Sequence, residues 1–276
     1  MPVSPAQPID PTPRNQLPLP RSFVAIGDSF TEGLDDPLPD GSYRGWADLV
    51  ATRLAEQEPQ FQYANLAIRG RLFDAVVSEQ VPAALRMRPD LISFAAGGND
   101  ALRRSFDVDR ICWRLDRIVE QMRGTGATVL LFTAADVSGL LPARRVLLPR
   151  IQALNEIIRR VAAAHEAVLI DLWADTGFAD RRLWSEDRLH LSPLGHRRVA
   201  AHVLRALGVE ADPEWMQTLP SQPPRPWLSA RREDLVWVRR HFAPWIRRRL
   251  AGRSSGDNVL PKRPELAPVQ AFTADR

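Results

Sequence analysis

The chain has 276 residues, of which 45% are hydrophobic and 25% charged, as in an ordinary globular protein. Its single cysteine, Cys112, excludes an intramolecular disulfide framework and any Cys-x-x-Cys metal or redox site. Its single lysine, Lys262, follows a proline and not a glycine-rich turn, which excludes a P-loop. No apolar run approaches the roughly 18–20 residues of a membrane span, and no signal peptide is visible. We therefore expect a soluble, cytoplasmic protein.

The positive charge is concentrated in the C-terminal part of the chain. Residues 1–210 carry 25 Lys+Arg against 26 Asp+Glu, whereas residues 211–276 carry 12 against 7. Residues 1–20 contain seven prolines and little that could form a core. We therefore predict a disordered leader over 1–20, a folded domain over 21–210 and an Arg-rich extension over 211–276.

From residue 22 onward, short apolar runs alternate with longer segments of helical periodicity. Strands are predicted at five runs, namely Phe23–Ile26, Phe61–Leu66, Leu91–Ala95, Thr128–Thr133 and Ala167–Leu172. Helices are predicted between them, at Trp46–Leu54, Ala75–Leu85, Val108–Met122 and Ile151–Ala163. This alternation predicts an α/β domain with a parallel sheet covered by helices on both faces.

Glycines and polar residues follow these runs. They lie beyond the carboxyl ends of the strands, at the edge where open parallel sheets bind ligands. They are Gly27-Asp28-Ser29 after the first run, Gly70 after the second, Gly97-Gly98-Asn99-Asp100 after the third, Asp136 after the fourth and Asp187-Arg188-Leu189-His190 in the loop after the fifth. Small residues and residue types used in catalysis therefore meet at one edge, which predicts an active site there.

Ser29 lies where a strand gives way to a helix. Taken alone, it is best interpreted as an N-cap, the commonest reason for serine in this place. A serine becomes a useful nucleophile when a base accepts its proton, and His190 titrates in the right range. Asp187, three residues before His190, can fix its tautomer and stabilise its charged form. We therefore predict Ser29, His190 and Asp187 as a catalytic triad.

An acyl-transfer site also needs donors for the developing oxyanion. Gly70 can offer an unobstructed backbone N–H and Asn99 a side-chain amide, and together with the N–H of Ser29 they would form a three-donor pocket. The structural alternatives are a turn role for Gly70 and a turn or cap role for Asn99. We expect Asp28 and Asp100 to orient the loops by hydrogen bonding.

In several short segments, the sequence resembles the SGNH (GDSL-type) hydrolases. The resemblance rests on Gly27-Asp28-Ser29 with Gly33, Asn65 to Gly70, Gly97-Gly98-Asn99-Asp100, and Asp187-Arg188-Leu189-His190, followed by Gly195-His196. It implies a flavodoxin-like three-layer α/β/α fold with a five-stranded sheet of order 2-1-3-4-5. It also implies the triad and oxyanion roles given above and an esterase, lipase or thioesterase activity that needs no metal or cofactor. Bulky Arg69 stands where small residues are frequent in the family.

We accordingly predict a serine hydrolase that cleaves a small-molecule carboxylic ester or thioester through an acyl-enzyme on Ser29. The alternative is a non-catalytic module of the same fold that uses its basic tail to bind anionic lipid or nucleic acid. The spacing of His190, His196 and His202 does not place them on one helical face, so we expect no metal site. The sequence gives no indication of oligomeric state.

Two loops, 137–150 and 173–186, are expected to wall the substrate pocket with leucines, tryptophans and a phenylalanine. An amphipathic helix is predicted over 227–250 of the extension, with arginines off its apolar stripe. Docking of this helix on the folded domain is favoured over contact with a membrane or a nucleic acid. We also expect the extension to be dispensable for ester hydrolysis.

Overall fold

The computed structural model describes residues 19–137, 139–141, 144–220, 231, 234–244, 247 and 254–269. Nearly all of the predicted leader and much of the predicted helix over 227–250 lie outside these residues.

The core of the fold is a mostly parallel sheet. Its strands are β1 (Ser22–Gly27), β2 (Gln62–Asn65), β3 (Leu91–Ala95), β4 (Thr128–Phe132), β5 (Val168–Ile170) and β6 (Arg263–Pro268). They lie in the order β5-β4-β3-β1-β2-β6, and β1 to β5 are parallel to one another. The predicted α/β class and the order 2-1-3-4-5 of the first five strands are therefore confirmed.

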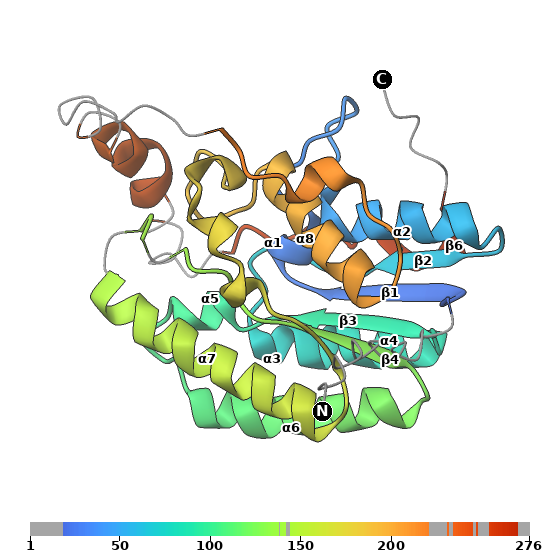
Figure 1. Cartoon of the computed structure of the whole chain (residues 1–276). Coiled ribbons are helices and arrows are strands. Elements are labelled where there is room, and N and C mark those ends of the chain that lie inside the picture. The colour runs from blue at the N-terminus through green and yellow to red at the C-terminus, as the bar shows by residue number, and fades with distance from the viewer. Residues whose placement is uncertain are drawn as a thin grey trace, which may run out of the picture.

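Helices cover both faces of the sheet, with one hydrophobic cluster on each face (Figure 1). The main helices are α1 (Ser29–Glu32), α2 (Gly45–Gln57), α3 (Phe73–Ala75), α4 (Val81–Met87), α5 (Gly98–Ala101), α6 (Val108–Gly124), α7 (Arg144–Ala164) and α8 (Pro193–Ala206). A π-helical turn, Val76–Gln80, joins α3 to α4. In Figure 1, α2 and α8 lie on one side of the sheet, and α3, α4, α6 and α7 lie on the other.

The sheet has six strands where the sequence predicted five. The additional strand β6 comes from the C-terminal extension and pairs antiparallel with the edge strand β2. Its sequence, Arg263 to Pro268, contains two prolines and no run of alternating apolar residues, so it carries no ordinary strand signal. An edge strand tolerates proline because one row of its backbone N–H groups needs no partner in the sheet.

Helix α7 begins earlier than predicted. The segment expected to be a loop before residue 150 is helical from Arg144, and Pro149 lies inside the helix. The prediction began where the apolar stripe begins, at Ile151, and Pro149 gives no sign of an earlier start because proline in a helix removes one backbone hydrogen bond. The early start adds Leu147 to the inner side of α7, where it is buried like Ile151. Within the described residues, no helix is long and apolar enough to cross a membrane.

Candidate active site

Ser29 is the first residue of α1, and only Asp28 separates it from the end of β1. The preceding Asp28 caps this helix by accepting a hydrogen bond from Phe30 N at 3.1 Å. Gly27 lies so close to β3 that a Cβ there would be 2.5 Å from the carbonyl oxygen of Ala95. The cap role that the sequence offered Ser29 thus belongs to its neighbour, and the Ser29 hydroxyl is available for other contacts.

Ser29, His190 and Asp187 form a continuous hydrogen-bonded series. The Oγ of Ser29 lies 3.0 Å from Nε2 of His190, whose Nδ1 lies 2.5 Å from Oδ2 of Asp187. The other carboxylate oxygen of Asp187 accepts from the backbone N–H groups of Leu189 and His190, at 2.9 and 3.0 Å, and from the Ser185 hydroxyl at 2.7 Å. These bonds hold the carboxylate in place, so the imidazole is oriented toward Ser29.

The electrostatics of the series favour proton transfer to the imidazole. Burial lowers the pKa of His190, but the hydrogen bond and charge of Asp187, helped by Asp35 and Asp28, outweigh it and raise the pKa above its usual 6.5. Burial alone would raise the pKa of Asp187, yet its bonds to His190 hold that pKa well below its usual range. Asp187 is therefore ionised whenever His190 can accept a proton.

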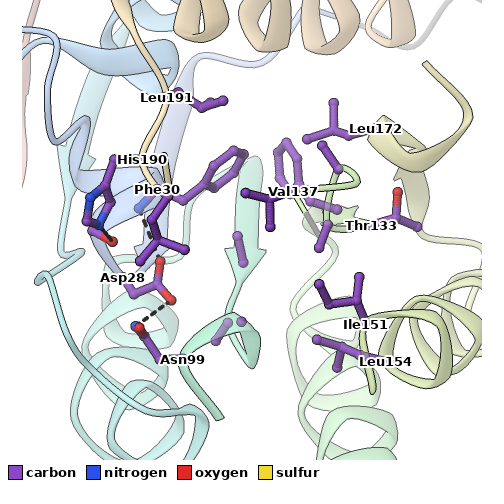
Figure 2. A pocket seen from close by; sticks show the side chains of 18 of the residues that line it. Asp28, Phe30, Asn99, Thr133, Val137, Ile151, Leu154, Leu172, His190 and Leu191 are labelled. Atoms are coloured by element: carbon purple, nitrogen blue, oxygen red, sulfur yellow. Dashed lines mark hydrogen bonds between the residues drawn. The ribbon is translucent and has the colours of Figure 1, made fainter. Parts of the chain in front are cut away.

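Asn99 points toward Asp28 at one end of the pocket (Figure 2). Its Nδ2 donates to Oδ2 of Asp28 at 3.1 Å and to the carbonyl oxygen of Arg71 at 3.0 Å. Both amide hydrogens are therefore engaged within the protein. Burial raises the pKa of Asp28 to about 6, partly offset by the Phe30 N–H and by His190. Asn99 could donate to an oxyanion by sharing or exchanging its bond to Asp28.

The remaining predicted site residues occupy the loops around this series. Gly70 has a φ of +75°, a left-handed conformation that suits glycine, in the loop after β2. Asp100 accepts a hydrogen bond from Phe73 N at 2.9 Å and so ties α5 to the start of α3. Among the described residues, the backbone N–H groups of Ser29 and Gly70 donate no hydrogen bond within the protein.

A largely apolar cavity of about 170 Å³ opens beside Ser29 and His190. Figure 2 shows Ile151 and Leu154 on α7 facing it from the side opposite Asp28. The two predicted wall segments both contribute, through Val137 and Leu147 in the first and Phe178 and Trp184 in the second. The arrangement places a polar series at one end of an apolar chamber.

The three histidines considered as a metal cluster have separate partners. His190 belongs to the series described above. The buried His196 accepts a hydrogen bond from Trp46 N and contacts the carbonyl oxygen of Leu34, while His202 contacts Asp175. The described residues contain one group with metal-ligand geometry, formed by Asp35, Asp187 and His190. Its imidazole and one of its carboxylates already serve the series described above.

Sequence reasoning missed two residues that shape the site. Asp35 places a second carboxylate 3.9 Å from Nδ1 of His190, and its φ of +69° gave no sequence signal. Gln80, buried in the π-helical turn, donates to the carbonyl oxygen of Gly27 at 2.9 Å and accepts from its N–H at 2.8 Å. The sequence signal for Gln80 was a polar side chain on the apolar side of a predicted helix, because a buried polar group needs a hydrogen-bond partner.

An α/β sheet of this order, with a Ser–His–Asp series beside an apolar cavity, is typical of a class of ester-hydrolysing enzymes. Residues 25–198, more than half of the chain, match the GDSL-like Lipase/Acylhydrolase family. The chain belongs to this family, and the resemblance to SGNH (GDSL-type) hydrolases is confirmed. It is therefore an ester-hydrolysing enzyme, and its family membership implies a small-molecule ester substrate.

Solved structures agree with this fold. TesA is 24% identical with a TM-score of 0.56, and the match covers 67% of this chain and 97% of TesA. The lipase/acylhydrolase from Enterococcus faecalis is 25% identical with a TM-score of 0.55, covering 74% of this chain and 100% of that one. A catalytic mutant of Axe2, an acetylxylan esterase from Geobacillus stearothermophilus, is 17% identical with a TM-score of 0.57, covering 72% and 97%. No curated protein matches the chain.

Proposed function

We propose that the protein is a serine esterase that transfers an acyl group from its ester substrate to Ser29 and then to water. The observation that carries this proposal is the series from Ser29 through His190 to Asp187 at the mouth of an apolar cavity. A lone serine at a helix start would be an ordinary structural residue. Here its hydroxyl is within hydrogen-bonding distance of an oriented imidazole.

The first half-reaction forms the acyl-enzyme. Oγ of Ser29 attacks the ester carbonyl carbon while Nε2 of His190 accepts the hydroxyl proton. The tetrahedral intermediate collapses, the bond to the alcohol oxygen breaks, and His190 returns the proton to the leaving alcohol. Asp187 stays ionised throughout and stabilises the imidazolium.

The second half-reaction regenerates the enzyme. His190 now takes a proton from water, whose oxygen attacks the acyl carbonyl carbon, and then returns that proton to Ser29 as the carboxylic acid leaves. In both steps the N–H groups of Ser29 and Gly70 and the amide of Asn99 stabilise the oxyanion. The loss of one such donor typically costs about 10²–10³ in turnover.

The cavity favours an acyl group longer than acetyl. Its lining is mostly apolar, although Thr133 lies away from the Ser29 end (Figure 2), and residues of α7, β4 and the segment before the triad loop form much of it. Burial of each methylene contributes about 0.8 kcal/mol in such a chamber. We therefore assign the cavity to the acyl chain and leave the alcohol side at the exposed edge of the site.

The test is hydrolysis of p-nitrophenyl acetate, butyrate and octanoate by the wild type, Ser29→Ala and His190→Ala. Both variants should lose at least about 10³-fold in kcat, with unchanged circular dichroism. Ser78→Ala, at an exposed serine, is the matched control and should behave as the wild type. Hydrolysis by Ser29→Ala at the wild-type rate would refute the serine mechanism, and a preference for acetate would refute the acyl-chain assignment.

A further inference from the structure

We propose that the C-terminal extension positions the catalytic loops, with Trp237 as the positioning residue for the loop that carries Asp187 and His190. The proposal rests on the proposed serine mechanism and goes beyond it. It assigns a role to residues outside the family match, which ends at residue 198. The described part of the extension reaches three elements of the site, and each contact supports one of them.

The first contact is on the loop of the triad. The indole Nε1 of Trp237 donates to the backbone carbonyl oxygen of Asp187 at 2.8 Å, and Trp237 is only 7% exposed. The guanidinium of Arg188 lies 5.0 Å from the centre of the Trp237 ring, and its Nη1 lies 2.7 Å from Oδ1 of Asp234. Two consecutive loop residues are thus held by one short helical segment of the extension.

One residue of this loop has a backbone conformation that contacts from the extension help to hold. Arg188 has a φ of +63°, in the left-handed region that non-glycine residues rarely adopt. Such a conformation persists only when surrounding contacts enforce it. The bonds to Trp237 and Asp234 supply such contacts between the acid and the base of the series.

The second contact is on the loop of Gly70. The hydroxyl of Ser254 donates to the Gly70 carbonyl oxygen at 3.3 Å, and the turn that follows packs on the same loop. A Cβ at Gly256 would lie 2.0 Å from the carbonyl oxygen of Arg69, so the two backbones touch directly. The turn over 254–257 therefore sets the position of the loop that offers the Gly70 N–H.

The third contact is at the end of α1, the helix that begins with Ser29. Nζ of Lys262 donates to the carbonyl oxygens of Glu32 and Arg44, both at 2.6 Å, and to Oδ2 of Asp48 at 2.7 Å. The next residues form β6, which fixes the extension to the sheet. Lys262 therefore joins α1, α2 and the extension at one ammonium group.

The test compares full-length Trp237→Phe with the wild type. Phenylalanine keeps an aromatic ring under Arg188 and removes the bond to Asp187. We expect kcat for p-nitrophenyl butyrate to fall about 10- to 100-fold, with KM within twofold. We also expect the acid limb of the pH–rate profile to move to lower pH. The Asp187 carboxylate is held less firmly in the variant and therefore raises the pKa of His190 less than in the wild type. A purely structural loss would lower the melting temperature and leave this limb in place.

Trp113→Phe is the matched control, because Trp113 is 67% exposed on α6 and should leave kcat and the pH profile unchanged. If Trp237→Phe is unfolded at the assay temperature, Asp234→Asn replaces it and should give the same direction of change in kcat. Asp234→Asn keeps the indole of Trp237 and removes the negative charge that pairs with Arg188.

Gly256→Ala tests the second contact independently. The new methyl group must displace the turn from Arg69, so we expect a lower kcat with an unmoved acid limb. Gly124→Ala, where an added Cβ meets nothing within 4 Å, is its control. The proposal is overturned if Trp237→Phe and Gly256→Ala both keep kcat within twofold of their controls. That result would leave the serine mechanism intact, whereas activity in Ser29→Ala would remove the mechanism itself.

Discussion

Asp187 controls both the orientation and the basicity of His190 in the proposed series. Asp187→Asn should lower kcat/KM by about 10²–10⁴-fold, because the amide no longer stabilises the imidazolium. The acid limb of the pH–rate profile should also move to lower pH, since the carboxylate that raises the pKa of His190 is gone. Asp109→Asn, at an exposed residue of α6, is the control. An unchanged acid limb in Asp187→Asn would contradict this account of the pair.

We expect the buried His196 to make the protein acid-sensitive. Burial lowers the pKa of His196 to about 4, because the charged imidazole would lose its solvation there, and its Nδ1 already accepts a hydrogen bond from Trp46 N. Between pH 6.5 and 4, His196 is protonated in the unfolded chain but stays neutral in the folded chain. The free energy of unfolding is therefore unaffected above pH 6.5 and falls as the pH decreases toward 4. The loss follows from the difference in bound protons between the two states.

Urea unfolding at pH 7.5 and pH 5 measures this effect. The wild type should lose more free energy of unfolding between the two pH values than His196→Gln, which has no proton to bind. His196→Gln should itself be less stable than the wild type at pH 7.5. Equal losses in the two proteins would show that His196 does not titrate in this way.

At the scale of single residues, the sequence predicted which residues lie together at the site better than it predicted the hydrogen bonds between them. Residues that follow parallel strands meet at one edge, which is why Ser29, Asn99 and His190 could be grouped without a structure. The bond from Asn99 to Asp28 could not be predicted, because it depends on side-chain rotamers. Asp35 was missed because its approach to His190 depends on a left-handed backbone in a loop. The catalytic roles stay predictions until variants are measured.

Helix α7 forms one wall of the cavity, so a larger residue there should shorten the accepted acyl chain. We predict that Ile151→Trp loses octanoate hydrolysis at least tenfold while acetate hydrolysis changes less than threefold, because the indole fills the space beyond the first carbons. Val146→Trp, on the exposed side of the same helix, should keep the wild-type profile. Retention of octanoate hydrolysis by a folded Ile151→Trp would place the acyl chain elsewhere.

Lys262, just before β6, and Asp48 of α2 form a largely buried ion pair. Lys262→Met should cost about 3–5 kcal/mol of unfolding free energy, because it leaves the Asp48 carboxylate buried without its cation. Adding Asp48→Asn should recover part of that loss by removing the charge. Denaturant unfolding of the two single variants and the double variant measures the coupling. Additive losses would mean that the pair contributes nothing of its own.

At the scale of elements, continuous apolar runs predicted the five parallel strands because both faces of such strands are buried. Their ends shift by a residue or two, as expected from the fraying of strand ends. Strand β6 was not predicted, because its pairing depends on contacts with β2 made across nearly two hundred residues of chain. The start of α7 was predicted too late because the prediction followed the apolar stripe from Ile151, whereas tertiary packing tolerates Pro149 inside the helix.

For the whole molecule, the structure changes what we expect of the extension. From the sequence we expected it to be dispensable for hydrolysis, but it contributes β6 and contacts three elements of the site. A chain that ends at residue 220 should have a lower melting temperature and should associate, because the edge of β2 loses its partner. Size-exclusion chromatography with light scattering and thermal unfolding measure both effects. A stable, monomeric and fully active shortened chain would restore the original expectation.

The central claim is that Ser29 is the nucleophile activated by His190, and covalent trapping tests it most directly. Full-length protein is treated with a fluorophosphonate, digested and analysed by mass spectrometry, beside Ser29→Ala and His190→Ala. We predict a single adduct on the peptide containing Ser29, absent in Ser29→Ala and formed at least about 10²-fold more slowly in His190→Ala. An adduct on another residue, or labelling of Ser29 at the same rate without His190, would contradict the claim.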